Sequence, residues 1–143
     1  MKNRIILCTV LLISVLTITV FASSFTIKIS IKSSTSTSIE LGKTLNLVVS
    51  FTNIGGDGIG AIVGKLEYDK NVFEKVSTDD INACSGWNSV AYNDIDGNDM
   101  EGSFTTERAS GDIIKTDNEL MEITLKVKDD ATIGSTVVKI TRN

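Results

Sequence analysis

Apolar and polar residues alternate along most of this 143-residue chain, and this period of two constrains the fold more than any other feature. In FTIKISIK (25–32), phenylalanine and isoleucine occupy every second position, with threonine, lysine and serine between them. The same alternation runs through TLNLVVSF (44–51), LMEITLKVK (120–128) and STVVKIT (135–141). Successive side chains of a β-strand point to opposite faces, so the pattern indicates strands that are buried on one face.

Clusters of turn-forming residues separate these alternating runs. SSTSTS (33–38) is a polar connector, GGDGIG (55–60) supplies glycines that tolerate positive φ, and DGND (96–99) and ASGD (109–112) follow. Short strands separated in this way are typical of two packed antiparallel sheets. We therefore predict an all-β fold, an antiparallel β-sandwich of about eight to nine strands. The strand phases predict a core that includes Leu66, Tyr68, Phe73, Phe104, Ile123 and Leu125.

Residues 1–22 have the features of a secretory signal peptide. Two basic residues precede an almost wholly apolar run over 5–20, and Ala22 is a small residue suited to cleavage. We expect residues 23–143 to form one secreted domain that is extracellular or associated with the cell surface. The apolar run is close to the shortest bilayer span, so a retained membrane anchor is the alternative. Because the chain ends directly after a strand, a domain truncated at its C-terminus is also left open.

The charge balance and composition exclude several classes of function. The chain has 14 basic and 18 acidic residues, a formal net charge of −4, and loss of residues 1–22 would make the remainder more acidic. Nucleic acids are bound by clustered Lys and Arg, so they are not expected as partners. The chain has no histidine, which excludes Ser-His-Asp and Cys-His catalysis and imidazole metal ligands. We therefore expect no enzymatic activity, no cofactor, and no membrane insertion after signal cleavage.

Cys84 and the acidic segment 93–99 also bear on possible chemistry. Cys84 is the only cysteine after residue 22, so we expect no internal disulfide. NDIDGND (93–99) begins like an EF-hand calcium loop, but Asp99 stands where that loop needs glycine and Thr105 where it needs glutamate. A hairpin turn on Asp96-Gly97 explains the segment more simply, so we predict no metal site.

Three blocks of the sequence, taken in order, resemble a cohesin domain. They are LGKTLNLVVSFTNI (41–54), GKLEYDKNVFEKV (64–76) and ITLKVKDDATIGSTVVKI (123–140). In that family a strand ending in Tyr-Asp precedes a turn and an apolar pair, as Tyr68-Asp69 here precedes Val72-Phe73. The resemblance implies a β-sandwich of jelly-roll type, a fold shared with some carbohydrate-binding modules. It also implies a non-catalytic module whose partner is a dockerin-type protein module, with any calcium belonging to the dockerin.

The resemblance further implies that strands at 61–68, 100–107 and 120–128 share one sheet, whose outer face binds the partner. Short hydroxyl side chains among opposite charges suit a polar protein interface. We predict docking in extracellular polysaccharide-degrading or cell-surface assemblies. The alternative for the same residues is the ordinary solvated face of an antiparallel sheet. The predicted partner-binding residues are Lys65, Glu67, Glu101, Ser103, Thr105, Glu122, Thr124 and Lys126.

Two other functions are left open by the sequence. The first is binding of a polysaccharide by a carbohydrate-binding module, with Trp87 and Tyr92 as the candidate aromatic platform. On one regular strand these two residues would point to opposite faces, which favours Trp87 as a core residue unless a bulge intervenes. The second alternative is a structural spacer of a surface adhesin.

Overall fold

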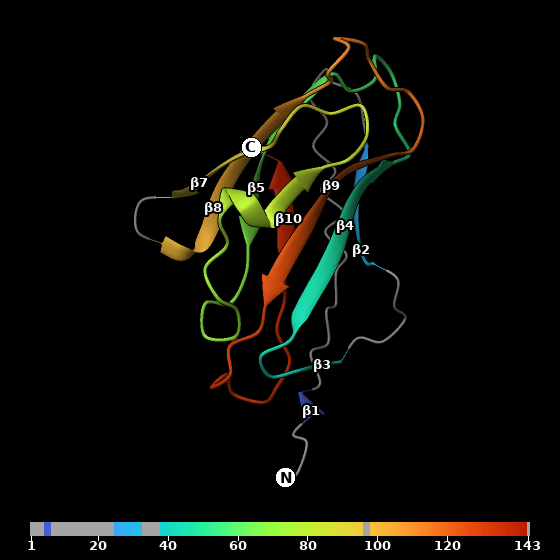
Figure 1. The fold of residues 1–143 in the computed structure, drawn as a ribbon. Helices are drawn as coiled ribbons and strands as arrows, with labels where there is room; N and C mark the ends of the chain where they lie inside the picture. The colour runs from blue at the N-terminus through green and yellow to red at the C-terminus, as the bar shows by residue number, and fades with distance from the viewer. Residues whose placement is uncertain (1–4, 7–24, 33–37, 96–97, 143) are drawn as a thin grey trace.

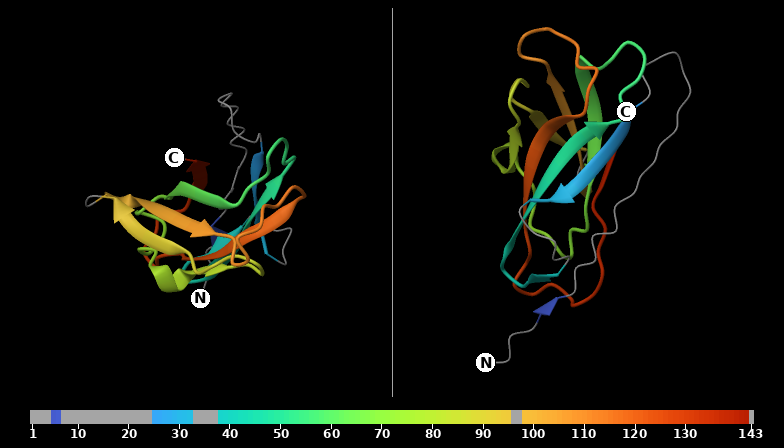
Figure 2. Two further views of the ribbon diagram at one scale, coloured as in Figure 1. Left: turned by 90° about the horizontal axis from the view of Figure 1, so that it is seen from above. Right: turned by 90° about the vertical axis from the view of Figure 1, so that its right-hand side faces the viewer.

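The protein folds into two four-stranded antiparallel sheets that pack face to face (Figure 1). The computed structural model describes residues 5–6, 25–32, 38–95 and 98–142. Sheet I has the strand order β2 (Thr26–Ile31), β4 (Thr44–Thr52), β9 (Asn118–Lys126), β6 (Ile81–Ala83). Sheet II has the order β10 (Lys139–Arg142), β5 (Ala61–Glu67), β8 (Asn98–Glu107), β7 (Ala91–Ile95). Figure 2 shows the two sheets as separate layers, which confirms the predicted all-β antiparallel sandwich.

The inward faces of the two sheets form one hydrophobic core. Along β4 the burial alternates strictly, so that Leu47, Val49 and Phe51 are fully buried while the residues between them are not. The six side chains predicted from strand phase as core residues are all at most 2% exposed. Tyr68 also has its hydroxyl satisfied, because it accepts a hydrogen bond from the backbone N–H of Val76 at 3.1 Å.

Two glycines allow aromatic rings to lie directly against the backbone of sheet II. A Cβ atom at Gly64 would lie 2.5 Å from the Phe104 ring, and one at Gly102 would overlap the ring of Tyr92. Both glycines are buried on the inward face, where any other residue at these positions would place a side chain in the core. Glycine at these two positions therefore leaves room in the core for the rings of Phe104 and Tyr92.

The placement of β9 corrects the predicted strand pairing. β5 and β8 are neighbours, as expected, with Lys65 opposite Ser103. β9, in contrast, pairs with β4 and β6 and so lies in sheet I. Alternation predicts which face of a strand is dry but contains no information on which strand lies beside it. The prediction that strands at 61–68, 100–107 and 120–128 share a sheet was therefore wrong for the third strand.

Short elements complete the part of the chain that the structure describes. β1 (Ile5–Ile6) pairs with β3 (Ile39–Glu40), and the 3₁₀ turn η1 (Thr78–Asp80) precedes β6. Most of the predicted signal segment and the predicted turn at Asp96-Gly97 lie outside the described residues. Across the described ranges, no helix is long and apolar enough to cross a membrane.

Truncation of Leu125 to alanine should destabilise the domain by about 2–5 kcal/mol, because its side chain is fully buried and a cavity would remain. Equilibrium unfolding in urea measures the change. The matched control is Lys126→Ala, which alters the next residue of β9 on the exposed face and should cost less than about 1 kcal/mol. Equal effects of the two substitutions would contradict the strand phase.

Candidate protein-docking face

The outward side chains of sheet II form the candidate docking face, called here the sheet II face. The registers of β10, β5, β8 and β7 place these side chains in rows across the sheet. The first row is Lys139, Glu67 and Glu101; the second is Thr141, Lys65, Ser103 and Asn93; the third is Val63, Thr105 and Ala91.

The sheet II face changes from charged to apolar along its strands. At the charged end Lys139 and Glu67 face each other with a nitrogen–oxygen distance of 3.8 Å, and both are partly exposed. At the other end Val63 is 49% exposed beside Thr105, and Ala91 lies on the far side of Thr105 in the same row. Apolar surface next to hydrogen-bonding and charged groups is the usual composition of a protein interface.

Five of the eight predicted partner-binding residues lie together on this face. They are Lys65, Glu67, Glu101, Ser103 and Thr105. The hydroxyls are also anchored, since Ser103 donates to the carbonyl of Asn93 at 3.4 Å and Thr105 to the carbonyl of Ile62 at 3.3 Å. Local sheet geometry thus fixes the orientation of these short side chains.

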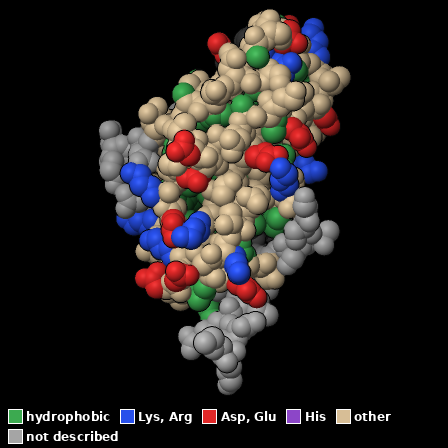
Figure 3. Space-filling view, in the orientation of Figure 1, with side chains coloured by type: hydrophobic (Ala, Val, Ile, Leu, Met, Phe, Trp, Pro, Cys, Tyr) green, Lys and Arg blue, Asp and Glu red, His purple; other side chains and the backbone are tan. Residues whose placement is uncertain are grey.

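The other three predicted residues, Glu122, Thr124 and Lys126, do not join this face. They belong to β9 and lie on the outer face of sheet I, the opposite side of the sandwich. There each has a local partner. The Glu122 carboxylate lies 2.6 Å from the Lys32 ammonium, and the Glu74 carboxylate lies 2.7 Å from the Lys126 ammonium. The Thr124 hydroxyl donates a hydrogen bond to the side-chain oxygen of Asn46 at 3.2 Å. Figure 3 shows acidic and basic side chains interspersed on the side of the molecule that carries β9.

The sequence analysis missed several members of the sheet II face, namely Val63, Ala91, Asn93, Lys139 and Thr141. For β10 a signal was present, because burial of Val138 and Ile140 places Lys139 and Thr141 outward by alternation. For β7 the signal was absent, because the sequence does not show that β7 lies at the edge of this sheet. Strand order, rather than strand phase, was the missing information.

Trp87 and Tyr92 do not form an exposed aromatic platform. Each is only 6% exposed, so neither ring offers a face on which a sugar could stack. Trp87 donates its indole N–H to Asn118 at 2.9 Å, and Tyr92 packs over Gly102. The prediction of Trp87 as a core residue is confirmed. The opposite orientations expected on one regular strand do not occur, because residues 88–90 are not a regular strand and both rings are buried.

Arg108 clamps the outer side of Trp87. Its guanidinium carbon lies 5.2 Å from the centre of the indole ring, and its Nε donates to Asp112 at 2.9 Å. This hydrogen bond, with a further one from Ser110, lowers the pKa of the Asp112 carboxyl below its usual value. The Arg108 side chain is 11% exposed and that of Asp112 is 53% exposed, so a mostly buried cation is held by a carboxylate in contact with solvent.

Neither a metal centre nor an activated thiol is evident in the described ranges. No group of three or more His, Cys, Asp and Glu side chains is arranged there to hold a metal ion. Burial raises the pKa of the Cys84 thiol, and the nearby carboxylates of Glu119 and Glu122 add to the effect. A raised pKa leaves less thiolate and so a less reactive cysteine.

Comparisons with known proteins agree with this architecture. A family model of the cohesin domain matches residues 23–143. The type I cohesin in the OlpA cohesin–dockerin complex of Clostridium thermocellum is 22% identical, with a TM-score of 0.56 over 71% of this chain and 74% of that one. The seventh ScaB type I cohesin from Pseudobacteroides cellulosolvens is 22% identical, with a TM-score of 0.55 over 73% of this chain and 68% of that one.

A third structure covers more of the chain. The cohesin module of a family 33 glycoside hydrolase from Clostridium perfringens is 14% identical, with a TM-score of 0.54 over 84% of this chain and 95% of that module. No curated protein matches the sequence. The fold places the chain among the antiparallel β-sandwiches. The family match over 23–143 shows that the chain belongs to the cohesin family.

Acidification should selectively weaken the Arg108–Asp112 clamp. A carboxyl with a lowered folded-state pKa contributes stability above its unfolded-state pKa, and that contribution is lost as the pH falls through the folded-state value. Asp112→Asn should therefore be less stable than wild type at pH 7, with the difference shrinking below about pH 4. Urea unfolding followed by the fluorescence of Trp87, the single tryptophan, measures both values.

The matched control for this prediction is Asp130→Asn, which changes an exposed aspartate in another loop. It should leave stability at pH 7 close to wild type. An Asp112→Asn variant that is as stable as wild type at neutral pH would show that the clamp contributes nothing.

Proposed function

We propose that this cohesin domain is a secreted, non-catalytic module that docks a dockerin-type partner on the sheet II face. The observation that carries the proposal is the clustering of Lys65, Glu67, Glu101, Ser103 and Thr105 on one sheet face of a cohesin domain. Several similar solved structures are cohesins in complex with dockerins, which supports the class of partner.

The electrostatics of the two outer faces favour sheet II over sheet I. On sheet I the charged residues of β9 are held in ion pairs of 2.6 and 2.7 Å. On the sheet II face, the ion pair seen between described residues is the long contact of 3.8 Å between Lys139 and Glu67. Among the described residues, neither Lys65 nor Glu101 forms an ion pair. A partner at sheet II can therefore bind these charges without first breaking a close ion pair.

The proposed cellular location follows from the N-terminal sequence. The predicted signal peptide over 1–22 supports secretion and a place at the cell surface or outside the cell. We propose a role in holding enzymes within an extracellular polysaccharide-degrading or cell-surface assembly. The calcium of such a complex would belong to the dockerin rather than to this domain.

The test is a charge exchange on the sheet II face. The double variant Lys65→Glu/Glu101→Lys keeps the net charge and should weaken binding of a dockerin encoded in the same genome by about tenfold or more, because complementary charges become repulsive. Biolayer interferometry at low and high salt measures the affinity. The loss should be smaller at high salt because the exchanged groups are partly exposed.

The matched control is the same exchange on sheet I, Glu122→Lys/Lys126→Glu. It changes the same residue types and should leave dockerin affinity within about twofold of wild type. Loss of binding in the control alone would move the docking face to sheet I. Failure of every dockerin of that genome to bind the folded wild type would contradict docking and favour a structural spacer.

A further inference from the structure

A hollow beside the C-terminal end of β9, called here the lysine hollow, is lined mainly by basic side chains. Its lining residues are Lys70, Asn71, Lys75 and Lys128, and its volume is about 410 Å³. The first three are exposed in the loop that follows β5, and Lys128 lies partly buried just after β9. Among the described residues, no carboxylate lines this hollow.

The backbone holds the two segments of the lysine hollow together. Phe73 forms a β-bridge with Val127, and both side chains are buried in the core. Beside this bridge, the N–H of Lys128 donates to the carbonyl of Val72 at 2.9 Å. The loop itself begins with a tight turn, because the N–H of Phe73 donates to the carbonyl of Asp69 at 2.9 Å. The backbone that carries the lysines is therefore fixed, which reduces the ordering that a ligand must impose.

Each of the three lysines is next in sequence to an acidic residue whose carboxylate is held at another group. Asp69 accepts a hydrogen bond from the backbone N–H two residues later at 2.8 Å. The Glu74 carboxylate lies 2.7 Å from the Lys126 ammonium. The Asp129 side chain lies against the backbone of Gly42. The lining of the hollow consequently consists of ammonium groups and one amide, and it presents positive charge to a ligand.

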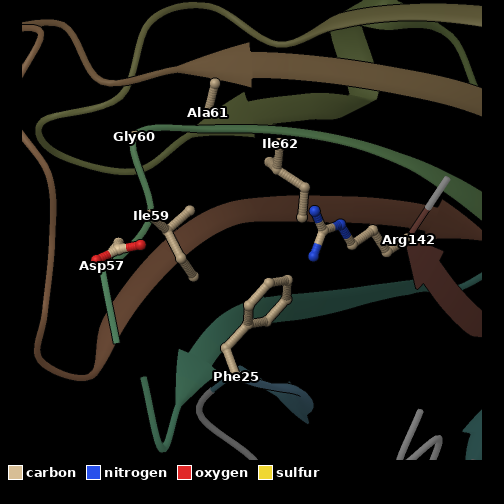
Figure 4. Close-up of a pocket in the computed structure, with 8 residues that line it drawn as sticks. Phe25, Asp57, Ile59, Gly60, Ala61, Ile62 and Arg142 are labelled. Carbon is tan, nitrogen blue, oxygen red and sulfur yellow. The ribbon is translucent and has the colours of Figure 1, made fainter. Parts of the chain in front are cut away.

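A second hollow has a different chemistry. It has a volume of about 250 Å³, with Ile59 and Ile62 in its apolar wall. Figure 4 shows the guanidinium of Arg142 between the Phe25 ring and Ile62, with Asp57 at the other end of the hollow. One cation and one carboxylate leave that lining close to neutral. The lysine hollow, in contrast, favours an anion.

The side chains of the lysine hollow suit a tetrahedral oxyanion. A lysine ammonium has three N–H donors and no acceptor, and the amide of Asn71 adds two donors. A phosphate or sulfate monoester has three free oxygens, which matches the three ammonium groups, whereas a carboxylate has only two. Hydrogen bonds between such charged groups are about twice as strong as neutral ones. The volume is typical of small-molecule sites, so the anionic group has room to be carried on a larger molecule.

We propose that the lysine hollow binds a phosphate or sulfate monoester of a sugar-sized molecule. The ester oxygens would accept hydrogen bonds from Lys70, Lys75 and Lys128, and the Asn71 amide would donate a further one. The chain has a net charge of −4, so the attraction is local to the hollow rather than a property of the whole surface. The site uses no residue of the sheet II face and does not depend on the function proposed for that face.

The test is an NMR titration of the isotope-labelled protein with glucose 6-phosphate, glucose 6-sulfate and glucose at constant ionic strength. Both esters should cause saturable shift changes at the amides of Asn71, Lys75 and Lys128, and glucose should cause none. The phosphate ester carries about −1.5 to −2 charges at pH 7 and should bind more tightly than the singly charged sulfate ester. Binding of one ester alone would identify the anionic group. Absence of saturable changes with both esters would overturn the proposal.

Two double variants separate the lysine hollow from general attraction. Lys70→Ala/Lys75→Ala should weaken binding of glucose 6-phosphate by about tenfold or more, because two charged donors are lost. The matched control, Lys28→Ala/Lys115→Ala, removes two exposed lysines that lie on β2 and before the start of β9. It should leave the affinity within about twofold of wild type, since distant exposed charges are screened. Equal losses in the two variants, or no loss in the first, would refute a site at the lysine hollow.

Discussion

The structure depends on one constraint, which is that both sheets must bury their inward residues in the same core. Alternation along β4 and β9 places Phe51 and Leu125 in that core and leaves the intervening residues on the outer face. Rings in the core lie against glycine at positions 64 and 102, so the sheet II backbone has space for Phe104 and Tyr92. The outer faces are therefore a consequence of how the core is filled.

The amino-acid sequence predicted the fold class and the core because both depend on local periodicity. Leu66, Tyr68 and Leu125 are buried as their strand phases required. The sequence did not predict the sheet to which β9 belongs, since neighbours in a sheet are determined by contacts between distant segments. For that reason the predicted binding set divides between two faces, with Lys65 on one and Lys126 on the other.

The two outer faces differ in what already occupies their polar groups. The charges of β9 on sheet I are held in close ion pairs, so this face resembles an ordinary solvated surface. The sheet II face has a gradient from the charged end at Glu67 to the exposed Val63, which suits a folded partner.

An NMR titration of the isotope-labelled protein with a dockerin encoded in the same genome tests the central claim most directly. If the sheet II face is the docking surface, the largest amide shift changes should fall on β5, β8 and β10, around Lys65, Ser103 and Thr141. The amides of β4 and β9 should change little, because they lie in the other layer. Shift changes concentrated around Thr124 on β9, with β5 and β8 unaffected, would contradict the account.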